Sequence, residues 1–260
     1  MILSAHGLTV PAIFGHFHPK NVHERLVIIP TYDEKENIRE IISAVLRLEP
    51  AFDVLVVDDN SPDGTAAIVK SLEKEHPQRV YLLQRVGKLG LGTAYIAGFK
   101  WAIGNGYEFV FEMDADFSHD PNDLLRLYEA CSTGGADMSV GSRYVKGGHV
   151  RDWSWHRILL SFTASLYVRT ILWLDVRDTT AGFVCYKRST LEALPLDEIR
   201  FIGYAFQIEM KYRVRLAGFK IKEVPITFVD RIKGRSKMNS SIFKEAILGV
   251  LKMRVSIPRP

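Results

Sequence analysis

Five short apolar runs between Arg25 and Tyr144 are separated by segments in which apolar residues recur at helical spacing. The runs are long enough for buried strands, and the segments between them are long enough for crossover helices. Parallel strands need crossovers of this length, so the chain is expected to fold as an α/β protein with a mainly parallel sheet and helices on both faces. The expected strands are 25–30, 53–59, 79–85, 108–114 and 136–144, and the expected helices are 35–48, 62–77, 92–106 and 120–135.

The pattern changes after Tyr144. A long helical segment is expected over 153–174, strands over 180–188 and 220–230, and a helix over 204–217. We expect residues 1–24 to be a loose extension, 25–239 to form one domain, and 240–260 to form an amphipathic C-terminal helix with surface character. Within the domain, 25–144 is expected to bind a nucleotide and 145–239 an acceptor.

Composition places the chain among ordinary globular proteins, with 47% hydrophobic and 25% charged residues. Its two cysteines fit neither a metal spacing nor a disulfide framework, which favours a reducing, cytoplasmic setting. Positive charge gathers in the second half of the chain and suggests an anionic partner: phosphate, a membrane surface or nucleic acid. Nucleic acid ranks last because no nucleic-acid-binding motif is present.

Two helical segments raise the question of a membrane. Residues 158–174 are nearly long enough to span one, but Arg169 and several hydroxyl side chains favour a buried or interfacial helix. Residues 240–255 carry an apolar stripe flanked by cations. That pattern is typical of a packed terminal helix and equally of a helix lying on a membrane surface.

Acidic and polar residues follow three of the expected strands, in the stretches PTYDE, VDDNSPDGT and MDADFSH. Ligands of parallel sheets bind beyond the carboxyl ends of the strands. We therefore expect these three stretches to form one site.

The third stretch is the best candidate for a metal. Asp114 and Asp116 alternate in an extended chain and would point to the same side, where they could share Mg²⁺ or Mn²⁺ and leave positions for phosphate oxygens. The simpler interpretation is two solvated turn residues. Asp120 and Asp123 are better explained as the cap and first turn of the next helix, and His119 is as consistent with a turn residue as with a ligand.

The stretch VDDNSPDGT and the glycine-rich stretch after the third strand admit two interpretations each. Asp58 and Asp59 are able to accept hydrogen bonds from a ribose or a base, but their context is also good turn chemistry. The glycine-rich stretch after the third strand matches neither a Walker loop nor a dinucleotide fingerprint. Its amides and Lys88 could meet a diphosphate, or its glycines could serve tight packing. The cations expected near phosphate, each also explicable as part of a solvated basic face, are Arg143, Arg157, Arg231, Arg235 and Lys237.

Taken together, the ordered motifs resemble the dolichol-phosphate mannosyltransferase (polyprenyl-phosphate mannose synthase) family of inverting, GT-A-type glycosyltransferases, whose fold is Rossmann-like. The motifs are PTYDEKENI, VVDDNSPDGT, GKLGLGTAY, MDADFSHDP, VGSRY, TTAGFVCYKR, GYAFQIEM and GRSKM. They run from about Arg25 to Met238. The resemblance implies GDP-mannose as donor, a polyprenyl (dolichyl-type) monophosphate as acceptor, and Mg²⁺ or Mn²⁺ as cofactor.

The resemblance also implies roles for individual residues. Metal ligands would be Asp114, Asp116 and Ser118, and catalytic residues Asp116 and Arg143. Phosphate binding falls to Arg143, Arg157 and Ser161, with a closing loop that carries Arg235 and Lys237. The nucleotide pocket would hold Pro30, Tyr32, Glu34, Asp58, Asp59 and Lys88.

Two departures from the family pattern stand out. Asp33 occupies a position where the motif often has Asn. No C-terminal membrane spans follow the domain, so the chain resembles the family's short form and is expected to reach lipid peripherally, through surface helices or an anchoring partner.

The residues themselves favour a phosphate acceptor. A phosphate monoester is already anionic and needs cations, whereas a hydroxyl acceptor needs a carboxylate to take its proton. The resemblance implies where such a carboxylate would stand, because hydroxyl-using relatives of the family typically carry a Glu-Asp pair in the segment that reads FQIEM here, with only Glu209. The alternatives are transfer of another sugar to lipid phosphate or to a glycan hydroxyl, a catalytically silent nucleotide-sugar binder, and a metal-dependent phosphohydrolase.

Overall fold

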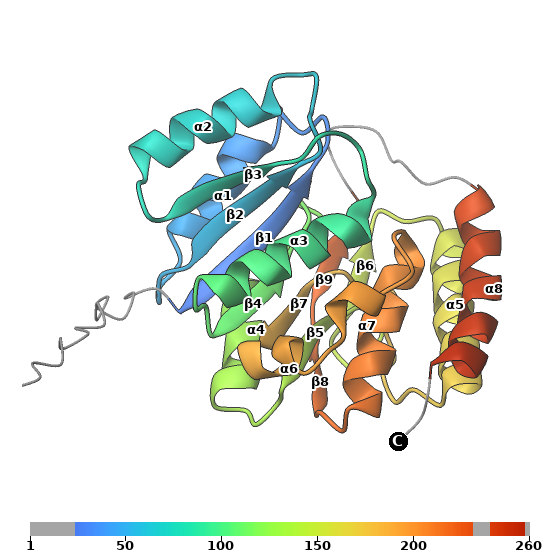
Figure 1. The fold of residues 1–260 in the computed structure, drawn as a ribbon. Coiled ribbons are helices and arrows are strands. Elements are labelled where there is room, and N and C mark those ends of the chain that lie inside the picture. Colours follow the sequence, from blue (N-terminus) through green and yellow to red (C-terminus); the bar gives the residue numbers. More distant parts are fainter. Residues whose placement is uncertain (1–23, 231–239, 258–260) are drawn as a thin grey trace, which may run out of the picture.

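A seven-stranded sheet with helices on both faces forms the body of the protein (Figure 1). The structure is a computed structural model that describes residues 24–230 and 240–257. The strand order is β3-β2-β1-β4-β7-β5-β8, and every pairing is parallel except those of β7. The strands are β1 Arg25–Thr31, β2 Asp53–Asp58, β3 Val80–Gln84, β4 Phe109–Glu112, β5 Met138–Ser142, β7 Val184–Lys187 and β8 Ile221–Pro225. The expected α/β fold is confirmed.

Strand β1 shows why both faces of the sheet are covered. Its side chains alternate, so Val27 and Ile29 belong to one apolar cluster while Leu26 and Ile28 belong to the other. The first cluster packs under α1 (Ile38–Leu46), α2 (Thr65–Glu75) and α4 (Asp123–Ser132). The second packs under α3 (Leu91–Gly104), α6 (Arg188–Glu192) and α7 (Tyr204–Leu216). A 3₁₀ turn, η1 (Leu196–Glu198), follows α6.

Two long helices stand at one side of the sheet and complete the fold (Figure 1). They are α5 (Trp155–Leu172) and α8 (Ser240–Ser256), and they pack on each other and on α7 through a third apolar cluster. Val168 and Leu172 of α5 meet Val250 and Met253 of α8 in this cluster. No helix among the described residues has the length and apolarity to cross a membrane.

Two expectations about the elements are wrong, and the position of one expected strand in the sheet was not predicted. The strand expected over 220–230 is two strands: β8 follows β5 until β5 ends at Ser142, and β9 (Thr227–Val229) then pairs with β6 (His149–Arg151) in a separate ribbon. Strand β7 lies antiparallel between β4 and β5, which sequence order does not suggest. Helix α4 has Asn122 rather than Asp120 at its N-cap, because the Asp120 carboxylate accepts the Asn122 N–H (2.9 Å) and holds the preceding turn.

Candidate active site

The three polar stretches lie together, as expected, because β2, β1 and β4 are neighbours in the sheet. Strand β4 ends at Glu112, opposite Ile28, and beyond that point β1 continues to pair with β2. Pro30 lies in this extension, where its missing N–H costs no hydrogen bond to β4. Strand β1 therefore extends further along this edge of the sheet than β4 does.

The end of β2 is held by its own carboxylates. Asp58 is fully buried and accepts hydrogen bonds from the Thr31 hydroxyl (2.8 Å) and from the N–H and hydroxyl of Ser61 (3.0 and 2.6 Å). Asp59 forms an ion pair with Arg85 and accepts the Leu89 N–H (3.2 Å). Both side chains thus brace the loops of the site, which matches the turn interpretation. Their contact with a nucleotide stays a prediction.

The glycine-rich loop after β3 is brought next to the end of β1. Arg85 donates to the hydroxyl of Thr93 (2.7 Å) and the carbonyl of Gly90 (3.2 Å), and so ties the loop to the start of α3. The Lys88 ammonium then lies 4.5 Å from the centre of the Tyr32 ring. Tyr32 and Lys88, both predicted for the nucleotide pocket, are therefore neighbours although they are distant in sequence.

The backbone after β1 explains the departure at Asp33. Its φ is 58°, in the left-handed region that Asp and Asn tolerate better than most residues. The Asp33 N–H donates to Ser61 Oγ (3.1 Å), and the Glu34 N–H donates to Thr65 Oγ1 (3.1 Å). The Glu34 carboxylate accepts from the Asn37 amide (3.0 Å). An Asp in place of Asn thus satisfies the same backbone requirement.

Asp114 and Asp116 lie on the loop beyond β4 and not on the strand itself, because the pairing of β4 with β1 stops at Glu112. Asp114 is half-buried and Asp116 buried. Asp116 accepts the N–H of Ser118 (3.0 Å) across Phe117, whose φ of 59° is unusual for a bulky residue. Strained backbone of this kind clusters at functional sites.

The donor set at this loop fits a hard divalent cation that keeps open positions. Within 24–230 and 240–257, no three His, Cys, Asp or Glu side chains gather around one point as a complete cage would require. Mg²⁺ commonly takes one or two carboxylates and completes its shell with water and substrate phosphates. Asp114 and Asp116 would hold the ion, and Ser118 stays a predicted third ligand.

His119 is part of the aromatic core. Its ring stacks on Phe183 (centroids 4.7 Å apart) and meets Phe228 edge-on (5.2 Å). Burial lowers the pKa of His119 to about 4, although the Asp116 carboxylate opposes that shift. The ring contacts show how this histidine packs, while its Nδ1, buried with no hydrogen-bond partner among the described residues, is still able to bind a metal ion.

Arg143 follows β5 and is held by a buried carboxylate. Its Nε and Nη2 donate to the two oxygens of Asp178 (2.7 and 2.6 Å), and Nη2 also donates to Thr180 Oγ1 (2.9 Å). The rings of Tyr144, Trp153 and Phe228 surround the guanidinium at 5.3–5.5 Å. The guanidinium is thus fixed in one orientation. Nothing in the DTTAG stretch distinguished Asp178 in advance, since a single Asp in a loop is common.

Arg157 and Arg143 share one aromatic ring. The Arg157 guanidinium lies 3.9 Å from the Trp153 ring centre, and that of Arg143 lies 5.4 Å from it. Asp230 pairs with Arg157 (2.8 Å). Ser161 is one turn after Arg157 on the same face of α5. The three residues predicted to bind phosphate are therefore brought together, whereas Arg231, Arg235 and Lys237 lie outside the described residues.

The pairing of Asp178 with Arg143 predicts a pH dependence. Burial alone would raise the pKa of Asp178, but the charge and hydrogen bonds of Arg143 outweigh it and lower the pKa below 3.8. The ionised pair thus stabilises the fold above about pH 4, and this contribution is lost as the pH falls further, through the lowered pKa.

Chemical unfolding should show that Asp178→Asn costs stability at neutral pH and that its difference from wild type shrinks below about pH 4. Asp175→Asn, at an exposed position three residues earlier, is the control; a difference for Asp178→Asn that persists to about pH 2 would contradict this account.

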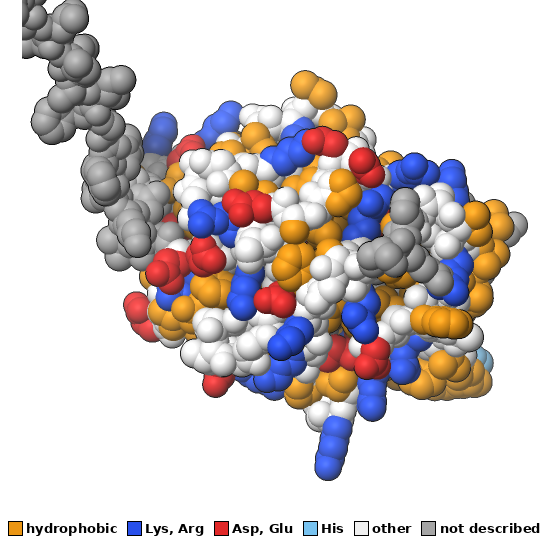
Figure 2. All heavy atoms as spheres, turned by 60° about the horizontal axis from the view of Figure 1, so that its bottom comes forward, with side chains coloured by type: hydrophobic (Ala, Val, Ile, Leu, Met, Phe, Trp, Pro, Cys, Tyr) orange, Lys and Arg blue, Asp and Glu red, His pale blue; other side chains and the backbone are white. Residues whose placement is uncertain are grey.

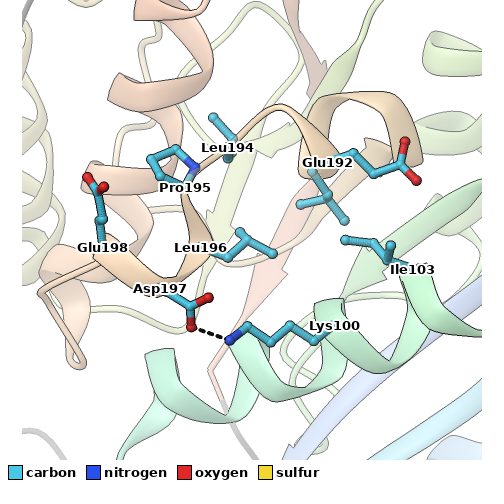
Figure 3. Close-up of a pocket in the computed structure, with 9 residues that line it drawn as sticks. Lys100, Ile103, Glu192, Leu194, Pro195, Leu196, Asp197 and Glu198 are labelled. Carbon is cyan, nitrogen blue, oxygen red and sulfur yellow. Dashed lines mark hydrogen bonds and ion pairs between the residues drawn. The ribbon is translucent and has the colours of Figure 1, made fainter.

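A shallow pocket elsewhere on the molecule is separate from these strand ends (Figure 3). It lies between α3 and the segment from α6 to η1, and the ion pair of Lys100 with Asp197 spans it. Its polar rim is mostly acidic (Glu192, Asp197 and Glu198), which is unsuited to a phosphate group. We do not assign it to the active site.

Known proteins resemble this chain in sequence and in fold. The model of "Glycosyl transferase family 2" matches residues 26–194. Polyprenol monophosphomannose synthase of Mycolicibacterium smegmatis is 48% identical over 86% of this chain and 84% of the relative. Undecaprenyl-phosphate mannosyltransferase of Micrococcus luteus is 46% identical over 87% of this chain and 92% of the relative.

The structural comparison supports the fold. Glucosyl-3-phosphoglycerate synthase from Mycobacterium tuberculosis, in complex with Mn²⁺, UDP and glucosyl-3-phosphoglycerate, superposes with a TM-score of 0.65 at 18% identity, over 91% of this chain and 81% of that chain. At this identity the likeness concerns the fold alone. The family match and the two close relatives go further and confirm the resemblance to polyprenyl-phosphate mannosyltransferases: the chain belongs to glycosyl transferase family 2 and is a glycosyltransferase of GT-A type.

Proposed function

We propose that this enzyme transfers mannose from GDP-mannose to a polyprenyl (dolichyl-type) monophosphate, with inversion, to give β-mannosyl phosphopolyprenol and GDP. The observation that carries the proposal is the pair of arginines on Trp153. Phe228 contacts both the Arg143 guanidinium and His119, which belongs to the acidic loop after β4. Two cations held so close together by a rigid ring are suited to an anion with several oxygens. The names of the two close relatives agree with a polyprenyl phosphate acceptor.

In this reaction a phosphate oxygen of the acceptor attacks the anomeric carbon while the bond from that carbon to the GDP oxygen breaks. Arg143 and Arg157 would hold the acceptor phosphate in line for attack. Lys88 and Tyr32, from 25–144, would contact the nucleotide, and 145–239 together with Arg143 would supply the acceptor side. A bound Mg²⁺ or Mn²⁺ at Asp114 and Asp116 would stabilise the negative charge of the leaving diphosphate.

The carboxylate in the segment where a hydroxyl acceptor would need a base is already committed. Glu209 is fully buried and accepts hydrogen bonds from the N–H groups of Arg200 (2.9 Å) and Phe201 (3.1 Å) and from Arg213 Nε (2.9 Å). A carboxylate with three donors is poorly placed to take a proton from a substrate hydroxyl. An acceptor phosphate needs no such base, which supports the lipid phosphate over a glycan hydroxyl.

A transfer assay tests this proposal. The purified protein is incubated with radiolabelled GDP-mannose, a short polyprenyl phosphate and Mg²⁺ or Mn²⁺, and the lipid phase is counted. We expect label in the lipid only when acceptor and metal are both present. Parallel reactions use UDP-glucose, UDP-GlcNAc and a glycan acceptor. Transfer from a UDP-sugar alone would overturn the mannose assignment, and release of free mannose without lipid product would indicate a hydrolase.

The outer face of α5 and α8 supports peripheral attachment to a membrane, which we propose is the cytoplasmic face. Helix α5 exposes Trp155, Leu159, Phe162 and Leu166 at spacings of four, three and four residues, so they form one stripe that is 47–65% exposed. Helix α8 adds Leu248, Leu251 and Val255. Figure 2 shows hydrophobic side chains interspersed with Lys and Arg on the side of the molecule where α5 and α8 lie in Figure 1.

Both helices are apolar inward as well as outward, so the exposed stripes are not needed to hold the fold together. Exposed apolar patches of this kind mark binding surfaces, and flanking cations suit anionic lipid headgroups. The side chains of 240–247 lie outside the described residues, and they include four of the six residues of the stripe predicted for the C-terminal helix (Ile242, Phe243, Ala246, Ile247, Val250 and Leu251). Docking this face on the bilayer would bring Arg157, in the first turn of α5, close to the headgroup layer.

Vesicle binding provides a direct prediction. Leu159→Glu should lower the partition of the protein onto anionic vesicles by about 10- to 100-fold, because a buried leucine contributes roughly 1.5–3 kcal/mol. Val86→Glu is the matched control, since Val86 is 91% exposed but lies on the loop after β3. Sedimentation with vesicles measures both. Equal losses for the two variants would contradict a docking face on α5 and α8.

A further inference from the structure

Lys211, on α7, is fully buried although it carries an ammonium group. Its Nζ donates to the carbonyl oxygens of Ala181 (2.6 Å) and Gln207 (3.3 Å) and lies 3.4 Å from Gln207 Oε1. Burial lowers the pKa of Lys211 to about 8, and the nearby Glu112 carboxylate opposes that shift. Lysine is almost never fully buried unless it has partners, and the chemistry described above does not use this one.

The same network reaches the end of β4. The side-chain amide of Gln207 donates to Glu112, and the Tyr186 hydroxyl donates to Glu112 Oε1 (3.2 Å). Glu112 is fully buried and is the last residue of β4, two positions before Asp114. Gln207 and Lys211 are one turn apart on α7, so one helix face contacts both the strand end and the 178–182 segment.

The carbonyl that Lys211 holds belongs to the segment that orients Arg143. Asp178 and Thr180 accept hydrogen bonds from the Arg143 guanidinium, and Ala181 follows Thr180 directly in the chain. The Ala181 N–H donates back to the Asp178 carbonyl (3.5 Å) and closes a turn. A displacement of Ala181 would therefore move the two side chains that position Arg143.

A buried ionic network is commonly no more stable than apolar packing of the same volume, so its presence calls for another explanation. We propose that Lys211 is a positioning residue: through Ala181 it holds the Asp178–Ala181 turn, and with it Arg143, in place relative to the loop that carries Asp114. This inference rests on the proposed function insofar as Arg143 binds the acceptor phosphate. It predicts that the effect of Lys211 on transfer passes through Arg143.

The kinetic test is a double-mutant cycle in full-length protein. Lys211→Met should raise the KM for polyprenyl phosphate by about tenfold or more, because small displacements of a binding group cost that much. The KM for GDP-mannose should stay within about twofold. In an Arg143→Lys background, where the two-pronged grip is already lost, Lys211→Met should add less than about twofold. A general loss of stability would raise neither KM selectively and would act equally in both backgrounds.

A second readout does not depend on transfer. The Arg143 Nε–H is hydrogen-bonded to Asp178, so its proton should exchange slowly with solvent. The ¹H–¹⁵N signal that reports this exchange is assigned by its loss in Arg143→Lys. Lys211→Met should speed that exchange by about tenfold or more. Thr190→Val is the matched control, because it also removes a buried side-chain donor to a backbone carbonyl, that of Asp137 (3.1 Å), away from Arg143.

If Lys211→Met does not fold, the charge-neutral pair Glu112→Gln with Lys211→Met replaces it in both tests. Additive effects in the cycle, or an unchanged exchange rate of the Arg143 signal, would overturn the inference. Absence of mannosyl transfer by the wild type, together with faster exchange in Lys211→Met, would instead refute the proposed function and leave the positioning role standing.

Discussion

Replacing Asp116 with alanine is expected to lower kcat for mannosyl transfer by about 10²- to 10³-fold, the range found when one preorganised electrostatic stabiliser is removed. The side chain is buried, belongs to the loop predicted to hold the metal, and also accepts the Ser118 N–H at 3.0 Å. The loss therefore combines weaker metal binding with a less ordered turn.

Asp116→Asn separates these two effects. The amide oxygen is still able to accept the Ser118 N–H, so the turn should persist, while the negative charge is gone. We expect a loss of activity close to that of the alanine variant, and an increase of about tenfold or more in the Mn²⁺ concentration needed for half-maximal activity. Asp120→Asn is the matched control, because Asp120 is exposed and lies on the same segment. Full activity of Asp116→Asn at low metal concentration would contradict the assignment.

Replacing Arg143 with alanine should impair both transfer and folding. Transfer should fall by about 10²- to 10³-fold because a fixed cation for the acceptor phosphate is lost. The free energy of unfolding should fall by about 3–5 kcal/mol, since Asp178 would remain as an uncompensated buried charge. Transfer kinetics and urea unfolding measure the two effects separately.

The double variant Arg143→Ala with Asp178→Asn distinguishes binding from folding. Removing the orphaned charge should restore much of the stability but none of the transfer. Arg143→Lys should keep the charge and most of the stability, yet lose the two-pronged geometry that a guanidinium offers to Asp178. Recovery of transfer in the double variant would show that Arg143 matters only for folding.

The fold was predictable to a large extent because its signals are local. Apolar runs such as 25–30 and 53–59 correspond to β1 and β2 within one residue at each end. The three polar stretches also lie at one edge of the sheet, as expected, because β1 lies between β2 and β4 in the parallel sheet. The features that were not predicted depend on partners distant in sequence: β7 lies between β4 and β5, and β9 pairs with β6 outside the main sheet.

The site was predictable only in part, for the same reason. Residue type and position pointed to Asp114, Asp116, Arg143 and Arg157. They did not show that Trp153 lies beside both arginines. They also did not show that Asp58 and Asp59 accept hydrogen bonds from neighbouring loops.

The sequence by itself determined the class of fold, the edge of the sheet where polar groups gather, and the family, because periodicity and motif order are properties of the chain read along its length. Only the tertiary structure decided how the cations are held. Arg143 meets Asp178 across 35 residues, and Arg157 meets Asp230 across 73. Lys211 reaches Ala181 across 30 residues. Pairings of this kind leave no local periodic signal, since they arise when separate elements pack and each buried charge must find a partner.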